Sequence, residues 1–456
     1  MVFGNTATQR NEFNNAGWQT LVRHAKNDGT ILAAYTYTLD NVGNRASMHE
    51  QSGDRVTWSY DSIYQLAREQ RSGSNAYDIT YTYDSVGNRL TKLQSAVTAT
   101  YSYDSVNRLD TEETPTQIVT YTFDNNGNNT VKDAAGQLTT LTWNKDNRMT
   151  VLALPSGALL TMTYDGQGFR RSLQDASGTQ KFLYDLRTGT PGLDPVLLET
   201  NASDVTQVVF TPGISMRRSG ATKYYHADAL GSVRLLTDSS QVISDSYIYE
   251  AFGKLVASSG STTNPLKFVG LENYYDDGTS GLLLLGVRYY DPKTGRFLSV
   301  DPEREGENWY VYAMSQPTIK TDPTGRDIFK DLMCAAARAA CEKLKERVLR
   351  EACLASVNAV CMPRPRPHPG PPPPPPPTPW PPPPIHEVKC PLGFCKTYVA
   401  AYIATCCPDG RPYCGPIDGF ATVCGIKPPT PTPPSTPTPP STAYDEPAFY
   451  HTSESW

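Results

Sequence analysis

Residues 81–93 read Tyr-Thr-Tyr-Asp-Ser-Val-Gly-Asn-Arg-Leu-Thr-Lys-Leu, and variants of this pattern recur through the first half of the chain. Residues 81–83 alternate aromatic and β-branched side chains, which is typical of a strand with one buried face. Residues 84–88 contain turn-forming types, because Asp bonds nearby backbone amides and Gly accepts a positive φ. Residues 89–93 alternate again. The pattern therefore predicts a β-hairpin of about twenty residues with a short loop.

The first turn residue of this unit returns at nearly fixed intervals. It stands at Asp40, Asp61, Asp84, Asp104, Asp124, Asn144, Asp165 and Asp185, with successive differences of 21, 23, 20, 20, 20, 21 and 20 residues. So uniform a period indicates one supersecondary unit copied along the chain. A lone hairpin cannot bury its apolar face, so stacked neighbours must do so. We therefore predict a mainly β fold built from repeated hairpins.

The repeated turn carboxylate has two interpretations. It is either a ligand for calcium or a sugar, or a residue that caps its own loop by bonding backbone amides. Asn144 takes the place of Asp in one copy without disturbing the period. A site that depends on charge would be sensitive to this change. The sequence therefore favours the turn-capping role.

The hairpin units, with their Tyr-Asp-x-x-Gly-Asn-Arg pattern, resemble the YD repeats of the Rhs family. Residues 224–232, 249–253 and 268–270 resemble further segments of that family, in the expected order. Residues 286–325 resemble the Rhs-associated core, and the resemblance covers roughly residues 30–326, about two thirds of the chain. It implies a β-ribbon that spirals into a hollow, teneurin-like YD shell closed at one end by the core. Related shells enclose a variable C-terminal domain, often a polymorphic toxin delivered to competing cells or hosts.

The resemblance also implies a self-cleavage site. Arg288, Asp301 and Asp322 match the family positions implicated in it, and the cleaved bond is expected between Arg326 and Asp327. Two carboxylates brought close together cannot both ionise at low cost, so one keeps a proton while the other activates water. The arginine would stabilise the negative charge that develops on the attacked carbonyl. The alternative is a structural network, because Asp-Pro-x-Gly segments are also good turn sequences.

Residue 326 departs from the family pattern, which usually has Leu directly after the Gly. An apolar side chain suits a dry pocket inside a shell, whereas the guanidinium of Arg326 needs a buried acidic partner there. Whether the site tolerates Arg326 is not decided by the sequence.

The chain is expected to divide into seven parts. They are a partial repeat at residues 1–30, the repeats at 31–250, the core at 251–326, a helical Cys-containing segment at 327–362, a proline-rich linker at 363–385, a Cys-rich module at 386–427 and a disordered Thr/Ser/Pro tail at 428–456. The linker is interpreted as a stiff spacer rather than a docking ligand.

The chain begins inside the repeats, with neither a signal peptide nor a plug domain. We therefore expect a truncated or split gene, or a partial shell that needs a partner.

All ten cysteines lie after residue 333. They are Cys334, Cys341, Cys353, Cys361, Cys390, Cys395, Cys406, Cys407, Cys414 and Cys424. The last six fall within 35 residues, a density typical of a small disulfide scaffold, although the sequence does not select their connectivity. Zinc is the alternative, but paired Cys-x-x-Cys knuckles are missing from the sequence. The cysteines favour disulfides and a secreted or cell-surface location.

No cofactor or metal site is predicted. The six histidines are scattered, and His226 with Asp228 is interpreted as structural. The leucine run at residues 282–285 suits a buried strand and is far shorter than a membrane span. The formal net charge of −5 gives no reason to expect nucleic-acid binding.

Three functions are compatible with the sequence. The first is the shell end of an Rhs-type delivery protein that presents or releases residues 327–456 as a variable domain in intercellular competition. The second is a cell-surface adhesion protein that displays a Cys-rich binding tip without catalysis. The third, compatible with the first, is autoproteolysis of the aspartic type alone, because the C-terminal region offers no recognisable effector enzyme. Expected partners are the missing N-terminal shell, a delivery apparatus, or cell-surface carbohydrate or protein.

Overall fold

The computed structural model describes residues 1–326 and four short strands farther along the chain. The chain divides into two units, Met1–Met362 and Pro363–Trp456, and each is considered by itself. In the second unit two antiparallel pairs are described: β29 (His386–Cys390) with β30 (Gly393–Thr397), and β31 (Tyr402–Cys406) with β32 (Pro412–Pro416). The predicted helical segment, linker and tail lie outside the described residues, and the predicted disulfides stay predictions.

Strands make up most of the first unit between residues 8 and 259. They are β1 (Thr8–Phe13), β2 (Gln19–Ala25), β3 (Ile31–Leu39), β4 (Arg45–Glu50), β5 (Arg55–Tyr60), β6 (Leu66–Ser72), β7 (Tyr77–Tyr83), β8 (Arg89–Gln94), β9 (Val97–Tyr103), β10 (Leu109–Thr114), β11 (Gln117–Phe123), β12 (Asn129–Ala134), β13 (Gln137–Trp143), β14 (Met149–Ala153), β15 (Leu159–Tyr164), β16 (Arg170–Asp175), β17 (Gly178–Tyr184), β18 (Val196–Asn201), β19 (Thr206–Thr211), β20 (Ser215–Arg218), β21 (Ala221–Ala227), β22 (Val233–Thr237), β23 (Ile243–Tyr249) and β24 (Leu255–Ser259).

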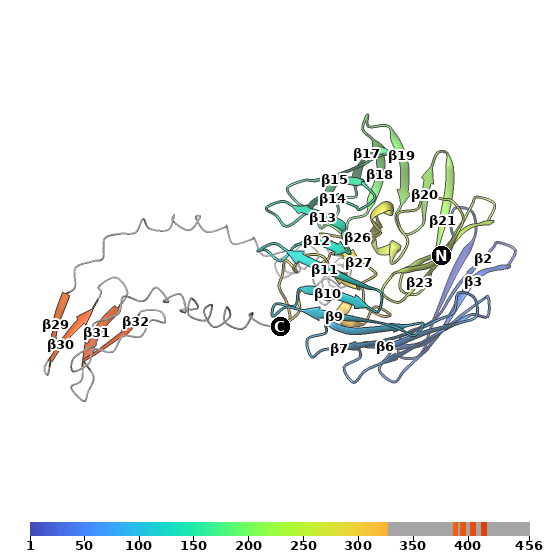
Figure 1. Cartoon of the computed structure of the whole chain (residues 1–456). Coiled ribbons are helices and arrows are strands. Elements are labelled where there is room, and N and C mark those ends of the chain that lie inside the picture. The colour runs from blue at the N-terminus through green and yellow to red at the C-terminus, as the bar shows by residue number, and fades with distance from the viewer. Residues whose placement is uncertain (327–385, 391–392, 398–401, 407–411, 417–456) are drawn as a thin grey trace, which may run out of the picture. The chain divides into compact units, whose positions relative to one another are not determined.

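These strands form one 24-stranded sheet in which neighbours in the sequence are neighbours in space (Figure 1). The pairing is antiparallel throughout, from β1 with β2 through β7 with β8 to β23 with β24. The sheet stays open, with β1 and β24 as its edge strands. The prediction of a mainly β fold made of repeated hairpins is therefore confirmed.

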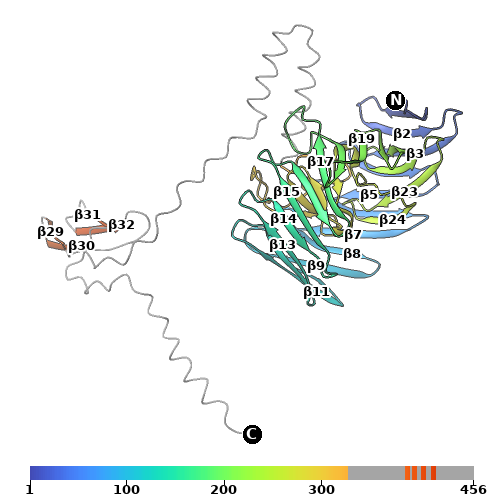
Figure 2. The same ribbon diagram turned by 90° about the horizontal axis from the view of Figure 1, so that it is seen from above.

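A bulge at the same place in successive hairpins bends the sheet. In most hairpins the register shifts at the end of the first strand, just before the turn residue, as between Thr82 and Tyr83. Equivalent shifts occur at Thr38/Leu39, Ser59/Tyr60, Thr122/Phe123, Thr142/Trp143 and Thr163/Tyr164. A bulge bends its strand and increases the local twist. Repeated at most hairpins, it makes the sheet curl, as the view from above shows (Figure 2).

Alternating side chains give the curled sheet an inner apolar face. In β7, Tyr77, Ile79 and Tyr81 are buried, whereas Asp78 and Thr82, which point to the other side, are exposed. Removal of this apolar surface from water is the main favourable contribution to folding. The repeat pattern of aromatic and β-branched residues thus places the core on one side of the ribbon.

The core segment that follows the repeats fills the inside of the curled sheet. It contains η1 (Gly270–Glu272), β25 (Tyr275–Asp276), η2 (Gly278–Ser280), β26 (Leu283–Leu285), β27 (Arg288–Asp291), β28 (Arg296–Phe297) and η3 (Ala313–Ser315). The leucines of β26 are buried, which confirms the strand predicted from the leucine run. Tyr290 and Tyr312 belong to the same apolar cluster as Tyr81 of the repeats. The core segment therefore packs against the buried apolar face of the hairpins.

The first hairpins also meet the last ones, although more than 180 residues separate them. The ring of His24 in β2 is hydrogen-bonded through Nε2 to the carbonyl oxygen of Ala227, 2.8 Å away. The amide of Ala229 donates to the Tyr37 hydroxyl at 3.1 Å. We call this contact between β2–β6 and β21–β23 the seam. It brings the two ends of the sheet together through side chains, without strand pairing.

Candidate functional site

The repeated turn residues from Asp40 to Asp165 cap their own loops, whereas in the longer loop after Asp185 the amides donate to Asp194 instead. The Oδ1 atom of Asp84 accepts hydrogen bonds from the amides two and four residues later, at 3.0 and 2.8 Å. Asn144 does the same at 2.9 and 3.0 Å, and so does Asp228 at 3.0 and 3.1 Å. An amide oxygen makes these bonds as well as a carboxylate, which explains why the period survives at Asn144. The turn-capping interpretation is confirmed.

The three residues predicted for self-cleavage lie together where the core ends. Arg288 is the first residue of β27 and its side chain is buried. Its Nη2 atom lies 3.0 Å from Oδ2 of Asp322 and 3.5 Å from Oδ2 of Asp301. Its Nε donates to the carbonyl of Gly325 at 2.5 Å and its Nη1 to that of Trp309 at 3.0 Å. One guanidinium therefore joins both carboxylates to the backbone directly before Arg326.

Two glycines allow the Asp-Pro-Thr-Gly segment to lie against the turn between β26 and β27. Gly286 has φ +51, and a Cβ there would lie 2.2 Å from the carbonyl oxygen of Thr324. Gly325 has φ +62, and a Cβ there would lie 2.3 Å from the carbonyl oxygen of Leu285. The amide of Val287 donates to the Thr324 carbonyl at 3.0 Å. Only residues without a side chain permit this approach, which brings Asp322 to Arg288.

The Asp322 backbone is fixed by a pair of buried tyrosines. Its amide donates to the Tyr274 hydroxyl at 2.6 Å, and that oxygen lies 3.1 Å from the hydroxyl of Tyr312. Sequence reasoning did not identify these tyrosines. They are 48 and 10 residues away from Asp322, and no periodicity links them to it.

Both aspartates are held in surroundings that favour their neutral forms. Burial raises the pKa of Asp301 to about 6, with Arg288 opposing the rise and Asp322 adding to it. Burial also raises the pKa of Asp322, against the effect of Arg288. The Oδ1 atom of Asp301 accepts from the Glu303 amide at 2.9 Å. Because each carboxylate raises the cost of ionising the other, the pair is suited to share one proton.

Arg326 is bonded to this group through both its backbone and its side chain. Its amide donates to Oδ1 of Asp322 at 3.1 Å. Its guanidinium pairs with Glu303 at 3.2 Å, which supplies the acidic partner that the sequence required without identifying it. An open cavity of about 470 Å³ borders Arg288, Asp322 and Arg326. Asp327, on the far side of the expected cleaved bond, lies outside the described residues.

A second group of buried charges lies in the seam. Arg71 donates to Glu50 at 2.7 and 2.9 Å and to Asp54 at 2.8 Å, and Arg234 donates to the same Glu50 at 2.7 Å. The sequence signal was a pair of charged residues, Glu69 and Arg71, at inward positions of β6. Sequence reasoning did not identify this charged group. In the sequence, Glu69 and Arg71 look like ordinary polar residues of a strand, and only the folded seam buries them.

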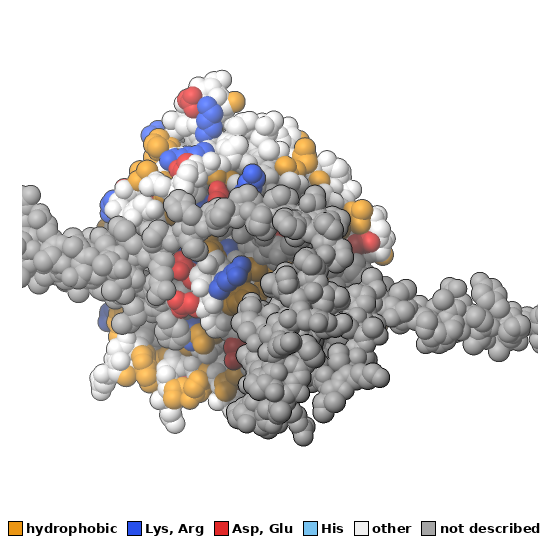
Figure 3. Space-filling model, turned by 90° about the vertical axis from the view of Figure 1, so that its left-hand side faces the viewer, with side chains coloured by type: hydrophobic (Ala, Val, Ile, Leu, Met, Phe, Trp, Pro, Cys, Tyr) orange, Lys and Arg blue, Asp and Glu red, His pale blue; other side chains and the backbone are white. Residues whose placement is uncertain are grey.

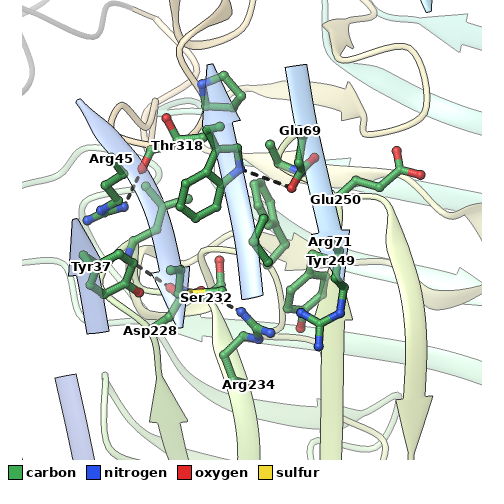
Figure 4. Close-up of a pocket in the computed structure, with 17 residues that line it drawn as sticks. Tyr37, Arg45, Glu69, Arg71, Asp228, Ser232, Arg234, Tyr249, Glu250 and Thr318 are labelled. Carbon is green, nitrogen blue, oxygen red and sulfur yellow. Dashed lines mark hydrogen bonds and ion pairs between the residues drawn. The ribbon is translucent and has the colours of Figure 1, made fainter. Parts of the chain in front are cut away.

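Glu69 lines a small cavity beside this group (Figure 4). Its carboxylate accepts from the Tyr77 hydroxyl at 2.9 Å and the Ala251 amide at 2.8 Å. Burial raises the pKa of Glu69 to about 7. The cavity measures about 50 Å³, which suits a few water molecules and no larger ligand. The group therefore serves to connect the two sides of the seam.

His226 has a structural role at the far end of the seam. Its ring centroid lies 4.9 Å from that of His24 and 5.0 Å from that of Phe3. Both histidines are completely buried, and His226 Nε2 lies 2.8 Å from the hydroxyl of Thr237. Burial lowers the pKa of His24 to about 4 and that of His226 to about 3. Both rings are therefore neutral and pack as part of the interior, which confirms the structural interpretation of His226.

Lowering the pH from 7.5 to 5.5 is expected to destabilise the protein through this histidine pair. In the unfolded chain both rings bind protons near pH 6.5, whereas the folded state resists protonation until about pH 4 or 3. The stability that this pair contributes is therefore highest above pH 6.5 and falls as the pH drops below it. At pH 5.5 the loss is about 1.4 kcal/mol for each histidine. Urea unfolding midpoints at the two pH values measure it.

The matched variants isolate the pair. In the His24→Gln/His226→Gln double variant the dependence on pH between 7.5 and 5.5 should shrink by this amount. His49→Gln, which changes an exposed histidine, should leave it as in the parent. An unchanged pH dependence in the double variant would show that other groups cause it.

The charges on the visible face of the molecule are mixed in sign. On the face shown in Figure 3, Lys and Arg side chains lie among those of Asp and Glu. Within the described residues, no three His, Cys, Asp or Glu side chains are grouped so as to hold a metal ion. Over the same part of the chain, no helix has the length and apolar character needed to cross a membrane.

Comparison with known proteins connects this geometry to a family. The Teneurin YD-shell family model matches residues 5–190. The tRNA3(Ser)-specific nuclease WapA of Bacillus spizizenii is 31% identical over 323 residues, covering 67% of this chain and 11% of that protein. Toxin protein Tse5 of Pseudomonas aeruginosa is 33% identical over 104 residues, covering 22% of this chain and 8% of that protein. A crystal structure of TcdB2-TccC3 aligns with a TM-score of 0.38 and 19% identity, over 70% of this chain and 21% of that one.

The chain spans about a tenth of the length of these two curated relatives. The similarity to the nuclease nevertheless extends over two thirds of this chain, farther than the family model reaches. With its uniform Tyr-Asp hairpins and the core segment that follows them, the chain belongs to the Rhs family of YD-repeat proteins.

Proposed function

We propose that this chain is the shell end of an Rhs-type delivery protein that cuts its own backbone after Arg326 and so releases residues 327–456. The observation that carries the proposal is the contact of Arg288 with both Asp301 and Asp322 at the end of the core. The same guanidinium holds the Gly325 carbonyl, and Asp322 holds the Arg326 amide. The backbone to be cut is thus attached directly to the charged groups that would cut it.

In the proposed reaction a water molecule adds to the carbonyl carbon of Arg326, and the C–N bond to Asp327 breaks. Asp322 is the ionised carboxylate, because Arg288 and the Arg326 amide both donate to it, and it takes a proton from the water. Asp301 carries the other proton and gives it to the leaving amine. Arg288 stabilises the charge on the attacked oxygen. One water is consumed, and the products are a carboxylate at Arg326 and an amine at Asp327.

The delivery role is supported by the relatives. One relative is named a tRNA nuclease and the other a toxin protein. The adhesion alternative has no comparable support among them. A shell that delivers a toxin acts outside the producing cell, so we propose a secreted or surface location. The partners we propose are the remaining N-terminal shell and a delivery apparatus, because a sheet with two open edges encloses little by itself.

The intact mass of the purified chain tests the self-cleavage. Cutting after Arg326 separates 130 of 456 residues, which in proportion is roughly 14 of 50.1 kDa. We expect two fragments whose masses sum to the parent plus one water, with Asp327 at the new N-terminus. A single uncut chain after prolonged incubation would contradict the proposal.

A further inference from the structure

The side chain of Arg326 is held by a carboxylate from the same turn that carries one of the aspartates. Glu303 lies two residues after Asp301, and its Oε1 is 3.2 Å from Nη1 of Arg326. Both side chains are only 17% exposed. The turn is closed by the Glu303 amide donating to Asp301 Oδ1 and by the Arg304 amide donating to the Asp301 carbonyl, at 2.9 and 3.1 Å. A substitution at Glu303 would therefore change the position of the Arg326 side chain directly.

The surroundings of Arg326 suit a cation better than an apolar side chain. Glu305 and Glu307 line the same cavity as Arg326. A Leu at residue 326 could not form the ion pair with Glu303. An Arg also makes stronger, better-directed bonds to a carboxylate than a Lys does, because its donors form a planar fork.

We propose that Glu303 is the specificity-determining residue of the self-cleavage site, and that it selects an arginine directly before the cleaved bond. The inference rests on the proposed self-cleavage. Glu303 holds the guanidinium of Arg326 and Asp322 holds its amide, so the residue before the cleaved bond is fixed at both its side chain and its backbone. Cleavage then depends on the match between residues 303 and 326 rather than on either residue alone.

A cycle of variants in the full chain tests this. Arg326→Leu and Glu303→Leu should each slow the appearance of the fragment by about tenfold, since each breaks the ion pair that positions residue 326. The Glu303→Leu/Arg326→Leu double variant should recover most of the rate, because an apolar pair replaces an ionic one. Arg326→Lys should fall between the parent and Arg326→Leu. Glu113→Leu, an exposed glutamate on β10, should cut at the parent rate.

The outcomes separate this inference from the proposed function. If the parent splits, Asp322→Asn does not, and the double variant is slower than either single one, the self-cleavage holds and the role of Glu303 is wrong. If Arg326→Leu splits faster than the parent while Glu303 is kept, arginine is not the preferred residue and the inference is overturned. If no variant and no parent splits although all retain the strand circular dichroism of the parent, the self-cleavage fails and the inference fails with it.

Discussion

Replacing Asp322 with Asn is expected to leave the chain uncut after Arg326 while the fold is retained. Asn has the same size and can still accept from the Arg326 amide, but it cannot take a proton from water. Loss of such a proton-transfer group typically slows a reaction about 10²–10⁴-fold. Mass spectrometry over a time course should show the fragment of roughly 14 kDa from the parent and none from the variant.

Two further variants show whether Asp322→Asn prevents cutting by removing a proton-transfer group. Asp301→Asn should abolish cutting as well, because the proposed reaction needs both members of the pair. Asp110→Asn, which changes an exposed aspartate on β10, should split at the parent rate. If Asp322→Asn releases the fragment at the parent rate, the Arg288 group is a structural network and not a site of proton transfer.

The hairpin scaffold was predictable because its causes are local. Each turn is closed by a carboxylate or amide that bonds amides two and four residues later, as at Asp84 and Asn144. Such contacts involve only a few consecutive residues. Their repetition along the chain produced the period of about twenty residues that the sequence shows. The eight periodic turn residues account for β3–β18, and the other eight strands of the sheet lie outside the recognised period. The seam could not be predicted, because its contacts join residues such as His24 and Ala227 that only the curl of the sheet brings together.

The three charged residues of the candidate site could be named from the sequence, but the contact between Glu303 and Arg326 could not. Arg288, Asp301 and Asp322 were named through a resemblance, and the structure places both carboxylates within 3.5 Å of the Arg288 guanidinium. Glu303 was missed because it stands 23 residues before Arg326 in irregular backbone. Irregular segments have no period from which facing residues can be read, so only the folded core shows which carboxylate meets which cation.

Breaking the buried ion pair between Arg170 and Asp277 is expected to cause a larger loss of stability than the histidine pair does. Nη1 of Arg170, at the start of β16, lies 2.6 and 2.7 Å from the two carboxylate oxygens of Asp277, and 2.8 Å from the Tyr289 hydroxyl. Each side chain of the pair is 1% exposed. Burial raises the pKa of Asp277 even with Arg170 beside it. Arg170→Met would leave this carboxylate unpaired, at a cost of about 3–5 kcal/mol measured as a shift in the urea unfolding midpoint.

Two comparisons establish that the cost comes from the unpaired buried charge. Lys181→Met breaks an exposed pair with Asp204, 2.8 Å long, and should change stability by about 0–1 kcal/mol. Arg170→Met/Asp277→Leu removes both buried charges and should regain much of what Arg170→Met loses, since no charge is left in the interior. A double variant as unstable as Arg170→Met would show that the guanidinium stabilises by packing on Phe182 and Tyr275, whose ring centroids lie 4.7 and 4.8 Å from it. The attachment of the core to the hairpins, and with it the position of Arg288, would then depend on aromatic contacts rather than on the ion pair.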